Sequence, residues 1–177
     1  DMAGWREMVE AIHHSTDPLA IAVVGKYVDL QDSYLSLTEA LLHAGLEHDR
    51  SIGVRWVRAE DIEEQGPDAL LHSVSGIVVP GGFGPRGIEG MIETVRYARV
   101  NRVPYLGLCL GLQVMVIEVA RRLLGKEDAN STEFDPDTSD PVIDLMPDQR
   151  NVTQMGGTMR LGRYPCDVVE GTWASRA

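Results

Sequence analysis

Short apolar runs alternate along the chain with longer segments in which apolar side chains recur at helical spacing. The runs are bounded by turn residues, as buried strands are, and lie at residues 19–24, 52–58, 77–79 and 104–108. The amphipathic segments, which we predict as helices, lie at residues 4–14, 34–48 and 88–100. Strands that alternate with helices indicate an α/β fold, with a mainly parallel sheet and helices on both of its faces.

The pattern changes toward the C-terminus. Residues 135–148 are rich in Asp and Pro, so we expect an irregular surface segment there, and residues 155–164 predict a further strand. The apolar stretch at residues 103–120 has the length of a membrane span but contains Pro104 and Glu118. We interpret this stretch as a buried strand that runs into a helix.

Composition limits the classes of partner. The 177 residues suit one domain, and the 27 Asp and Glu against 16 Lys and Arg give a net charge of -11. Because binding to phosphates needs clustered Lys and Arg, we expect no nucleic-acid partner. The two cysteines are too few for a disulfide framework and fit a reducing cytosol. We therefore expect a cytoplasmic protein with no membrane partner.

The strongest chemical motif is the Gly-x-Cys-x-Gly pattern around Cys109, where an apolar strand turns into a helix. This is the pattern of a nucleophile elbow, in which a sharp turn presents the central side chain at a helix N-terminus. The glycines on either side, Gly107 and Gly111, let neighbouring elements approach closely. Backbone N–H groups and the helix dipole there favour a thiolate. Cys166 lacks such a context, and we predict a structural role for it.

A second glycine-rich loop covers residues 80–87 and contains a G-x-G-x-x-G pattern between a strand and a helix. A dinucleotide site would also need an acidic residue about twenty positions further on, and none occurs there. We instead expect this loop to lie beside Cys109. Backbone N–H groups near Gly82 and Phe83, with that of Leu110, would then stabilise an oxyanion.

The sequence offers no metal site. The Asp-rich segment lacks the glycine that a calcium loop needs at its sharp turn. The histidines have no partner at metal-binding spacing, and we expect each on a surface or helix face; they are His13, His14, His43, His48 and His72.

Several segments together resemble one enzyme family. The motifs PGGFG at residues 80–84 and GLCLGLQ at 107–113 resemble the class I glutamine amidotransferases. Further segments, which narrow the resemblance to the CTP synthases, are GKYV at 25–28 with Ser33 and Tyr34, NSTEF at 130–134 and GGTMRLG at 156–162. The resemblance implies a flavodoxin-like fold. It also implies a linker or leading helix at residues 1–18 and the glutamine amidotransferase domain at 19–177.

The resemblance implies a role for residues of both loops. Cys109 would attack the side-chain amide of glutamine and form a glutamyl thioester, while Gly82 and Leu110 supply oxyanion donors. Gly82 would also contact the substrate. This domain would itself need no cofactor.

Substrate and effector contacts are implied as well. Gln113 and Glu133 would hold the amino-acid end of glutamine, and Phe83 would line the pocket. A loop linked to activation by GTP, an allosteric effector, would include Arg86, Gly87 and Glu89.

The same resemblance implies a larger enzyme. Ammonia would pass to an N-terminal synthetase domain of the same polypeptide, where ATP and Mg²⁺ serve the amination of UTP to CTP. The full-length enzyme would be a homo-oligomer, a tetramer by resemblance.

One departure from the family is clear in the sequence. The family completes a Cys-His-Glu triad with a downstream His-x-Glu motif, and no His follows Cys109. We therefore expect that the C-terminal part of the domain is missing, and that a polypeptide ending at Ala177 does not turn over glutamine. Two alternatives stay open. One is a catalytically silent relative that keeps the fold as a binding module, and the other is a peptidase or deglycase of the related cysteine-elbow family. In the latter family His usually follows the cysteine, whereas here Leu110 does.

Overall fold

The computed structural model describes residues 2–14, 18–145 and 165–176. Contacts divide the chain into two compact units, Asp1–Leu145 and Met146–Ala177. The first unit begins with helix α1 (Ala3–His14), as the amphipathic spacing predicts. The strand predicted at residues 155–164 lies outside the described residues.

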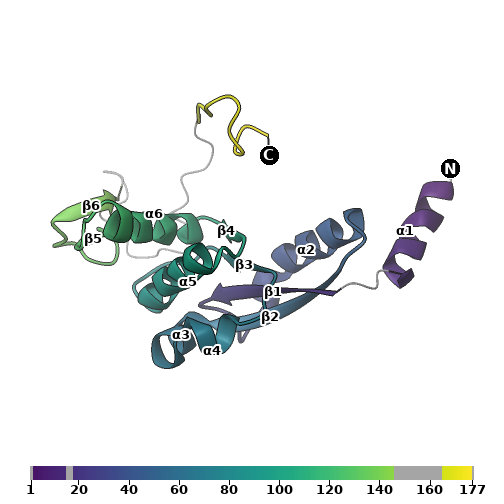
Figure 1. Cartoon of the computed structure of the whole chain (residues 1–177), viewed down its shortest axis with the longest axis horizontal. Coiled ribbons are helices and arrows are strands. Elements are labelled where there is room, and N and C mark those ends of the chain that lie inside the picture. Colours follow the sequence, from purple (N-terminus) through teal and green to yellow (C-terminus); the bar gives the residue numbers. More distant parts are fainter. Residues whose placement is uncertain (1, 15–17, 146–164, 177) are drawn as a thin grey trace. The chain divides into compact units, whose positions relative to one another are not determined.

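Within residues 18–145, the main sheet has four parallel strands in the order β2-β1-β3-β4. Its strands are β1 (Pro18–Gly25), β2 (Ser51–Arg58), β3 (Gly76–Val79) and β4 (Tyr105–Gly107). The pairing of β1 with β2 runs from Pro18 opposite Ser51 to Gly25 opposite Arg58. Because all four strands are parallel, their carboxyl ends meet at one edge (Figure 1). The predicted parallel sheet is confirmed.

Helices cover both faces of this sheet. The short helix η1 (Gln31–Tyr34) and α2 (Leu35–Glu47) connect β1 to β2, whereas α3 (Ala59–Gln65) and α4 (Pro67–Leu71) connect β2 to β3. The chain reverses its direction across the sheet at β2, so right-handed crossovers place these two pairs on opposite faces. Figure 1 shows α2 on one side of β1 and β2, with α3 and α4 on the other. Helix α5 (Ile88–Asn101) then leads to β4, and α6 (Leu110–Leu123) follows it.

The core lies between the sheet and the layer formed by α3, α5 and α6, in which α5 packs against both of its neighbours. Alternate strand residues face this layer, among them Ala22 and Val24 of β1. Buried members of the core from the other elements include Ile62, Leu71, Ile77, Val79, Met91, Val95, Val114 and Ile117.

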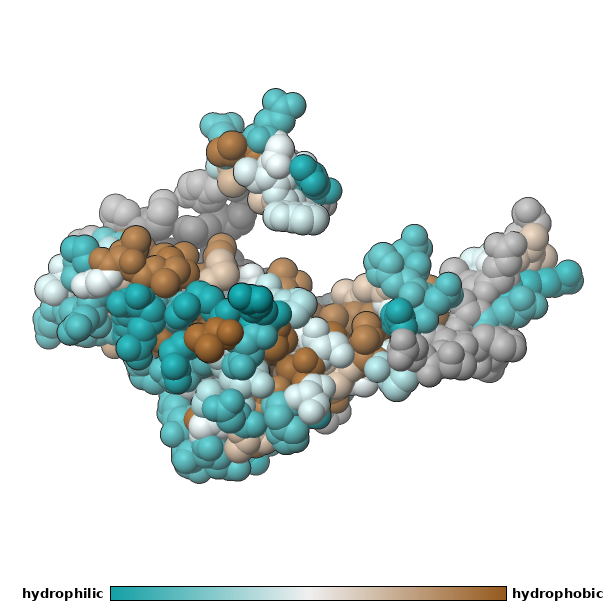
Figure 2. Space-filling model, in the orientation of Figure 1, coloured by the Kyte–Doolittle hydropathy of each residue, from teal (hydrophilic) through white to brown (hydrophobic). Residues whose placement is uncertain are grey.

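Helix α6 is apolar on its outer side as well. Figure 2 shows hydrophobic surface over α6, where Leu112, Val116, Leu123 and Leu124 are exposed. A helix that is buried on one side and apolar on the other explains why residues 103–120 form a nearly continuous apolar stretch. The interpretation of this stretch as a strand followed by a helix is correct, but the expected burial of the strand is wrong: β4 lies at the edge of the sheet, and Leu106 at its centre is exposed. Among the described residues, none of the helices has the length and apolarity needed to cross a membrane.

The prediction for residues 135–148 was partly wrong. Strand β6 (Asp140–Ile143) pairs in parallel with β5 (Ala129–Ser131) and forms a second sheet within the first unit. Val142 and Ile143 also pack against the core. Pairing with β5 and this burial outweigh the turn-forming composition of the segment, a tertiary effect that local composition does not reveal.

A buried ion pair joins α5 to α6. The Glu118 side chain is fully buried, and its Oε1 lies 2.6 Å from Nη2 of Arg99, while Nε of Arg99 donates to both carboxylate oxygens. A carboxylate without contact to water is tolerated in a core only when such bonds replace its hydration.

Replacing Arg99 with Met is expected to lower the free energy of unfolding by about 3 kcal/mol, because the Glu118 carboxylate then stays buried without its partner. We place the effect at the low end of the usual range because 35% of the Arg99 side chain is exposed. Urea unfolding followed by circular dichroism measures it. Arg96→Met is the control, since Arg96 and its partner Glu93 are more exposed, and should cost about 0.5 kcal/mol or less. Equal losses in the two variants would contradict this role for the buried pair.

Candidate active site at the Cys109 elbow

The two glycine-rich loops lie side by side at the carboxyl edge of the main sheet. Residues 80–87 follow β3, and Cys109 follows the neighbouring strand β4. A Cβ atom built on Gly81 would lie 3.5 Å from Cβ of Cys109 and 3.9 Å from its Sγ. The structure therefore brings together the two segments that the sequence analysis placed in one site.

The backbone at Cys109 makes a strained turn. Its φ of 53° and ψ of -105° lie outside the regions that residues with a side chain normally adopt. A Cβ on Gly107 would lie 2.4 Å from the Gly111 carbonyl oxygen, and a Cβ on Gly111 would lie 2.0 Å from the Val79 carbonyl oxygen. Only glycine fits at either position. The turn leaves Cys109 exposed at the N-terminus of α6.

Two backbone N–H groups beside the cysteine remain available to a ligand. Within the part of the chain that the structure describes, neither the Gly82 nor the Leu110 N–H donates a hydrogen bond. That of Leu110 belongs to the first turn of α6, whose N–H groups have no partner inside the helix. The Leu110 side chain is buried, with Cδ2 3.1 Å from the position of a Cβ on Gly82. Both loops thus contribute a free donor.

Glu133 reaches the first loop from the turn that follows β5. Its Oε1 accepts a hydrogen bond of 2.8 Å from the Gly84 N–H, a contact between residues 49 positions apart. Gln113 is half-buried in the first turn of α6, and its N–H donates to the Cys109 carbonyl oxygen at 3.2 Å. Phe83 is half-buried in the loop itself. These three predicted substrate contacts therefore come from three separate segments of the chain: a loop, a helix and a turn.

The sequence analysis assigned no role to Lys26, which follows β1 and is only 4% exposed. Its Nζ donates to the carbonyl oxygens of Phe83, at 3.0 Å, and Gly84. It also lies 5.9 Å from the centre of the Phe134 ring. Burial lowers the pKa of Lys26 to about 8, against the opposing effect of Glu133. The only signal in the sequence was the GKYV motif, which carried the resemblance without indicating a contact to the glycine loop.

The three residues of the predicted effector loop contact different parts of the structure. Arg86 pairs with Glu60, donates to the Lys26 carbonyl oxygen at 2.8 Å and lies 5.9 Å from the centre of the Tyr27 ring. Gly87 has a φ of 69°, and a Cβ there would lie 2.8 Å from that of Ala59.

Glu89 instead pairs with Arg121 of α6 at 2.8 Å. Glu89 is exposed in the first turn of α5. Arg86, in contrast, precedes that helix and donates to the carbonyl oxygen of Lys26, which directly follows β1. The structure therefore groups Arg86 with Lys26, and Glu89 with α6.

The remaining polar candidates lie at other places. His43, His48 and His72 are exposed; His43 lies 4.0 Å from Glu39, and His72 Nδ1 lies 2.9 Å from the Ala69 carbonyl oxygen. The side chains of His13 and His14 lie outside the described residues. Cys166 is exposed. Over the described ranges, no group of three or more His, Cys, Asp or Glu side chains could hold a metal ion.

The chain matches known proteins over most of its length. The family described as glutamine amidotransferase class-I matches residues 29–175. The CTP synthases of Dehalococcoides mccartyi and Chloroflexus aggregans are each 58% identical over all of this chain, which spans 32% of their length. That of Roseiflexus sp. is also 58% identical, over 178 aligned residues.

Among solved structures, the glutaminase domain of Trypanosoma brucei CTPS with bound acivicin superposes with a TM-score of 0.67. It is 38% identical, and the match covers 75% of this chain and 52% of the other. The fold, the two motifs and these similarities agree: the chain belongs to the class I glutamine amidotransferases and is similar to the glutaminase part of CTP synthases.

Proposed function

We propose that this chain is the glutaminase domain of a CTP synthase and that Cys109 is its nucleophile. The observation that carries the proposal is the geometry of the elbow. An exposed sulfur lies at the N-terminus of α6, in a strained turn, with Gly81 in contact across the sheet edge. Strain of this kind at an exposed nucleophilic residue is typical of active sites.

The reaction divides into two steps. The Cys109 thiolate adds to the amide carbon of glutamine, a C–S bond forms, and the carbonyl oxygen becomes an oxyanion. The N–H groups of Gly82 and Leu110 bind this oxyanion. The intermediate collapses when its nitrogen is protonated, ammonia leaves, and a glutamyl thioester remains. Water then cleaves the thioester to glutamate and the free thiol.

The proton for the leaving nitrogen requires a general acid. The described histidine side chains do not supply it, because their elements end at the opposite edge of the sheet. His43 and His48 lie at the end of α2, just before β2 begins, and His72 lies just before β3. The Cys109 loop, in contrast, follows the carboxyl end of β4.

The other end of glutamine would be held by Glu133 and Gln113. The Glu133 carboxylate can pair with the substrate ammonium group, and such charge-assisted hydrogen bonds are the stronger ones in proteins. Its place beside Gly84 supports this role, because it puts a carboxylate next to the loop that faces Cys109. Phe83 would line the same pocket.

The released ammonia would be used in another domain. The CTP synthases to which the chain is similar are about three times as long as the matched segment, which supports a synthetase domain on the same polypeptide. There ATP, with Mg²⁺, would phosphorylate UTP, and amination would give CTP. In this proposal GTP acts as effector through Arg86, Gly87 and Glu89, and the complete synthase is a cytoplasmic homo-oligomer.

In the complete synthase, a glutamine-mimicking diazoketone is expected to label Cys109 and to spare Cys166, because only Cys109 lies at a helix N-terminus between two glycine loops. Cys109→Ala should abolish glutamine-dependent CTP formation and leave ammonia-dependent formation nearly intact. Peptide mapping by mass spectrometry locates the label, and the matched variant Cys166→Ala should keep both activities. A label found on Cys166 would overturn the assignment of the nucleophile.

Arg86→Ala in the same enzyme is expected to reduce the stimulation of glutamine hydrolysis by GTP more than the unstimulated rate. The physical reason is that Arg86 ties the end of the glycine loop to Glu60 and to the Lys26 backbone and does not contact Cys109. Rates of ammonia release with and without GTP measure both effects, and Arg96→Ala, on the exposed side of α5, is the control. Equal loss of the two rates would place Arg86 in the catalytic site instead.

A further inference from the structure

The peptide between Phe83 and Gly84 is held from both of its sides. Its carbonyl oxygen accepts a hydrogen bond from Lys26 Nζ at 3.0 Å, and its N–H donates to Glu133 Oε1 at 2.8 Å. The C=O and N–H of one trans peptide lie in a plane and point in opposite directions. Opposed contacts at the two groups therefore fix the rotation of this peptide within the glycine loop.

Lys26 is itself fixed by packing. Its Cδ and Cε lie 3.4 and 3.6 Å from the position that a Cβ on Gly82 would occupy, so its stem lies directly against the proposed oxyanion glycine. Its carbonyl oxygen accepts the hydrogen bond from Arg86. A Lys that is only 4% exposed has lost most of its hydration, and its bonds to Phe83 and Gly84 replace it.

We propose that Lys26 is a positioning residue for glutamine hydrolysis: it holds the Phe83–Gly84 peptide against Glu133 and thereby keeps the Gly82 N–H directed at the oxyanion formed on Cys109. The inference rests on the proposed glutaminase function. Lys26 acts through the loop, because its ammonium donates to the carbonyl oxygens of Phe83 and Gly84. A loop with three glycines in residues 81–84 has little stiffness of its own, and an oxyanion donor is effective only when it is held in place beforehand.

The charge of Lys26 makes this device sensitive to pH. The charged groups around its ammonium are Glu133, Glu60 and Glu63, which favour the charged form, and Arg86, which disfavours it. Since burial lowers the pKa to about 8, the ammonium is present below that pH and is lost as the pH rises through it. Neutral Lys26 binds the two carbonyl oxygens more weakly. The rate of hydrolysis should therefore decline on the alkaline side, and an Arg at this position should move the decline to higher pH.

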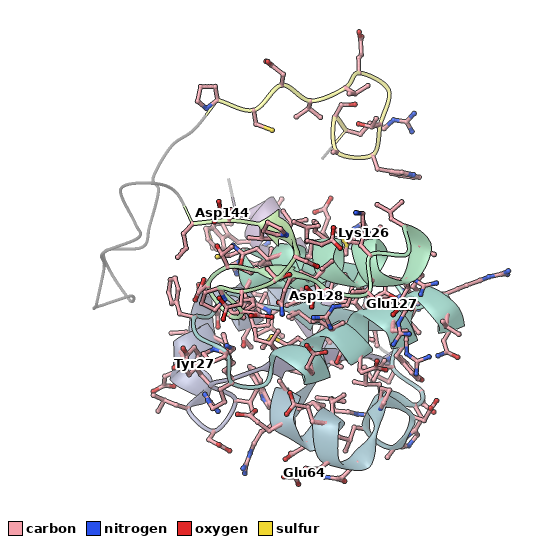
Figure 3. The ribbon with its side chains drawn as sticks, turned by 90° about the vertical axis from the view of Figure 1, so that its left-hand side faces the viewer. Tyr27, Glu64, Lys126, Glu127, Asp128 and Asp144 are labelled. Atoms are coloured by element: carbon pink, nitrogen blue, oxygen red, sulfur yellow. The ribbon has the colours of Figure 1, made fainter. Side chains whose placement is uncertain are left out.

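The test uses the complete synthase with Lys26→Met, which keeps most of the stem and removes the ammonium. We expect kcat for glutamine hydrolysis to fall about 10- to 100-fold with a smaller change in KM, because the lost alignment matters most in the transition state. Ammonia-dependent CTP formation should be unchanged. Lys126→Met is the matched control, since Lys126 is the other lysine of the chain and forms an exposed pair with Asp140. Figure 3 shows Lys126 well apart from Tyr27, the neighbour of Lys26.

Three outcomes would overturn the inference. The first is a Lys26→Met enzyme that hydrolyses glutamine within twofold of the unaltered one. The second is a parallel loss of ammonia-dependent CTP formation, which would mean a general structural role. The third outcome applies even if Lys26→Met fails to fold. It is a Lys26→Arg enzyme in which the rate of glutamine hydrolysis declines at the same alkaline pH as in the unaltered enzyme. An unaltered synthase that does not hydrolyse glutamine would overturn the proposed function, and the inference with it.

Discussion

The close approach of α6 to β3 determines where everything else in the site lies. At Gly111 the helix backbone comes so near the Val79 carbonyl group that a single added carbon would lie 2.0 Å from its oxygen. This approach forces the sharp turn between β4 and α6, and the turn forces Cys109 to adopt a positive φ. The strain is stabilised by the buried residues on either side, such as Leu110 and Val114. The exposed sulfur is thus a consequence of packing in the core.

The parallel sheet supplies the second condition. In an antiparallel sheet the ends of neighbouring strands alternate between edges, whereas here β1, β3 and β4 all end at the same edge. Lys26, the glycine loop and Cys109 follow these three strands in turn, so Lys26 contacts loop residues 57 and 58 positions further along the chain. The turn that follows β5 then adds Glu133. Each of these segments therefore contributes one part of the candidate site, and no single segment contains all of it.

Buried charges serve two different purposes in the first unit. Arg99 and Glu118 pair with each other and join α5 to α6. Lys26 donates to carbonyl oxygens of the loop that lies beside Cys109. Burying either kind of charge costs free energy. A pair between two helices can be replaced by apolar contacts, whereas a donor to the carbonyl oxygens of a loop determines the conformation of that loop.

The four strands of the main sheet, most of the helices and the elbow were predictable from the sequence because they depend on short-range patterns, whereas α3 and α4 were not predicted. The apolar run at residues 19–24 became β1, and the glycines around Cys109 mark a turn that is encoded within five residues. The sequence did not reveal the strand β6, the burial of Lys26 or the separation of Arg86 from Glu89. These depend on which surfaces meet after folding: β6 forms by pairing with β5, and Lys26 is buried by a loop 57 positions away. Local pattern thus determined most of the elements and the turn at Cys109, while tertiary packing determined the groups that hold the loop, because their contacts exist only when distant segments are brought together.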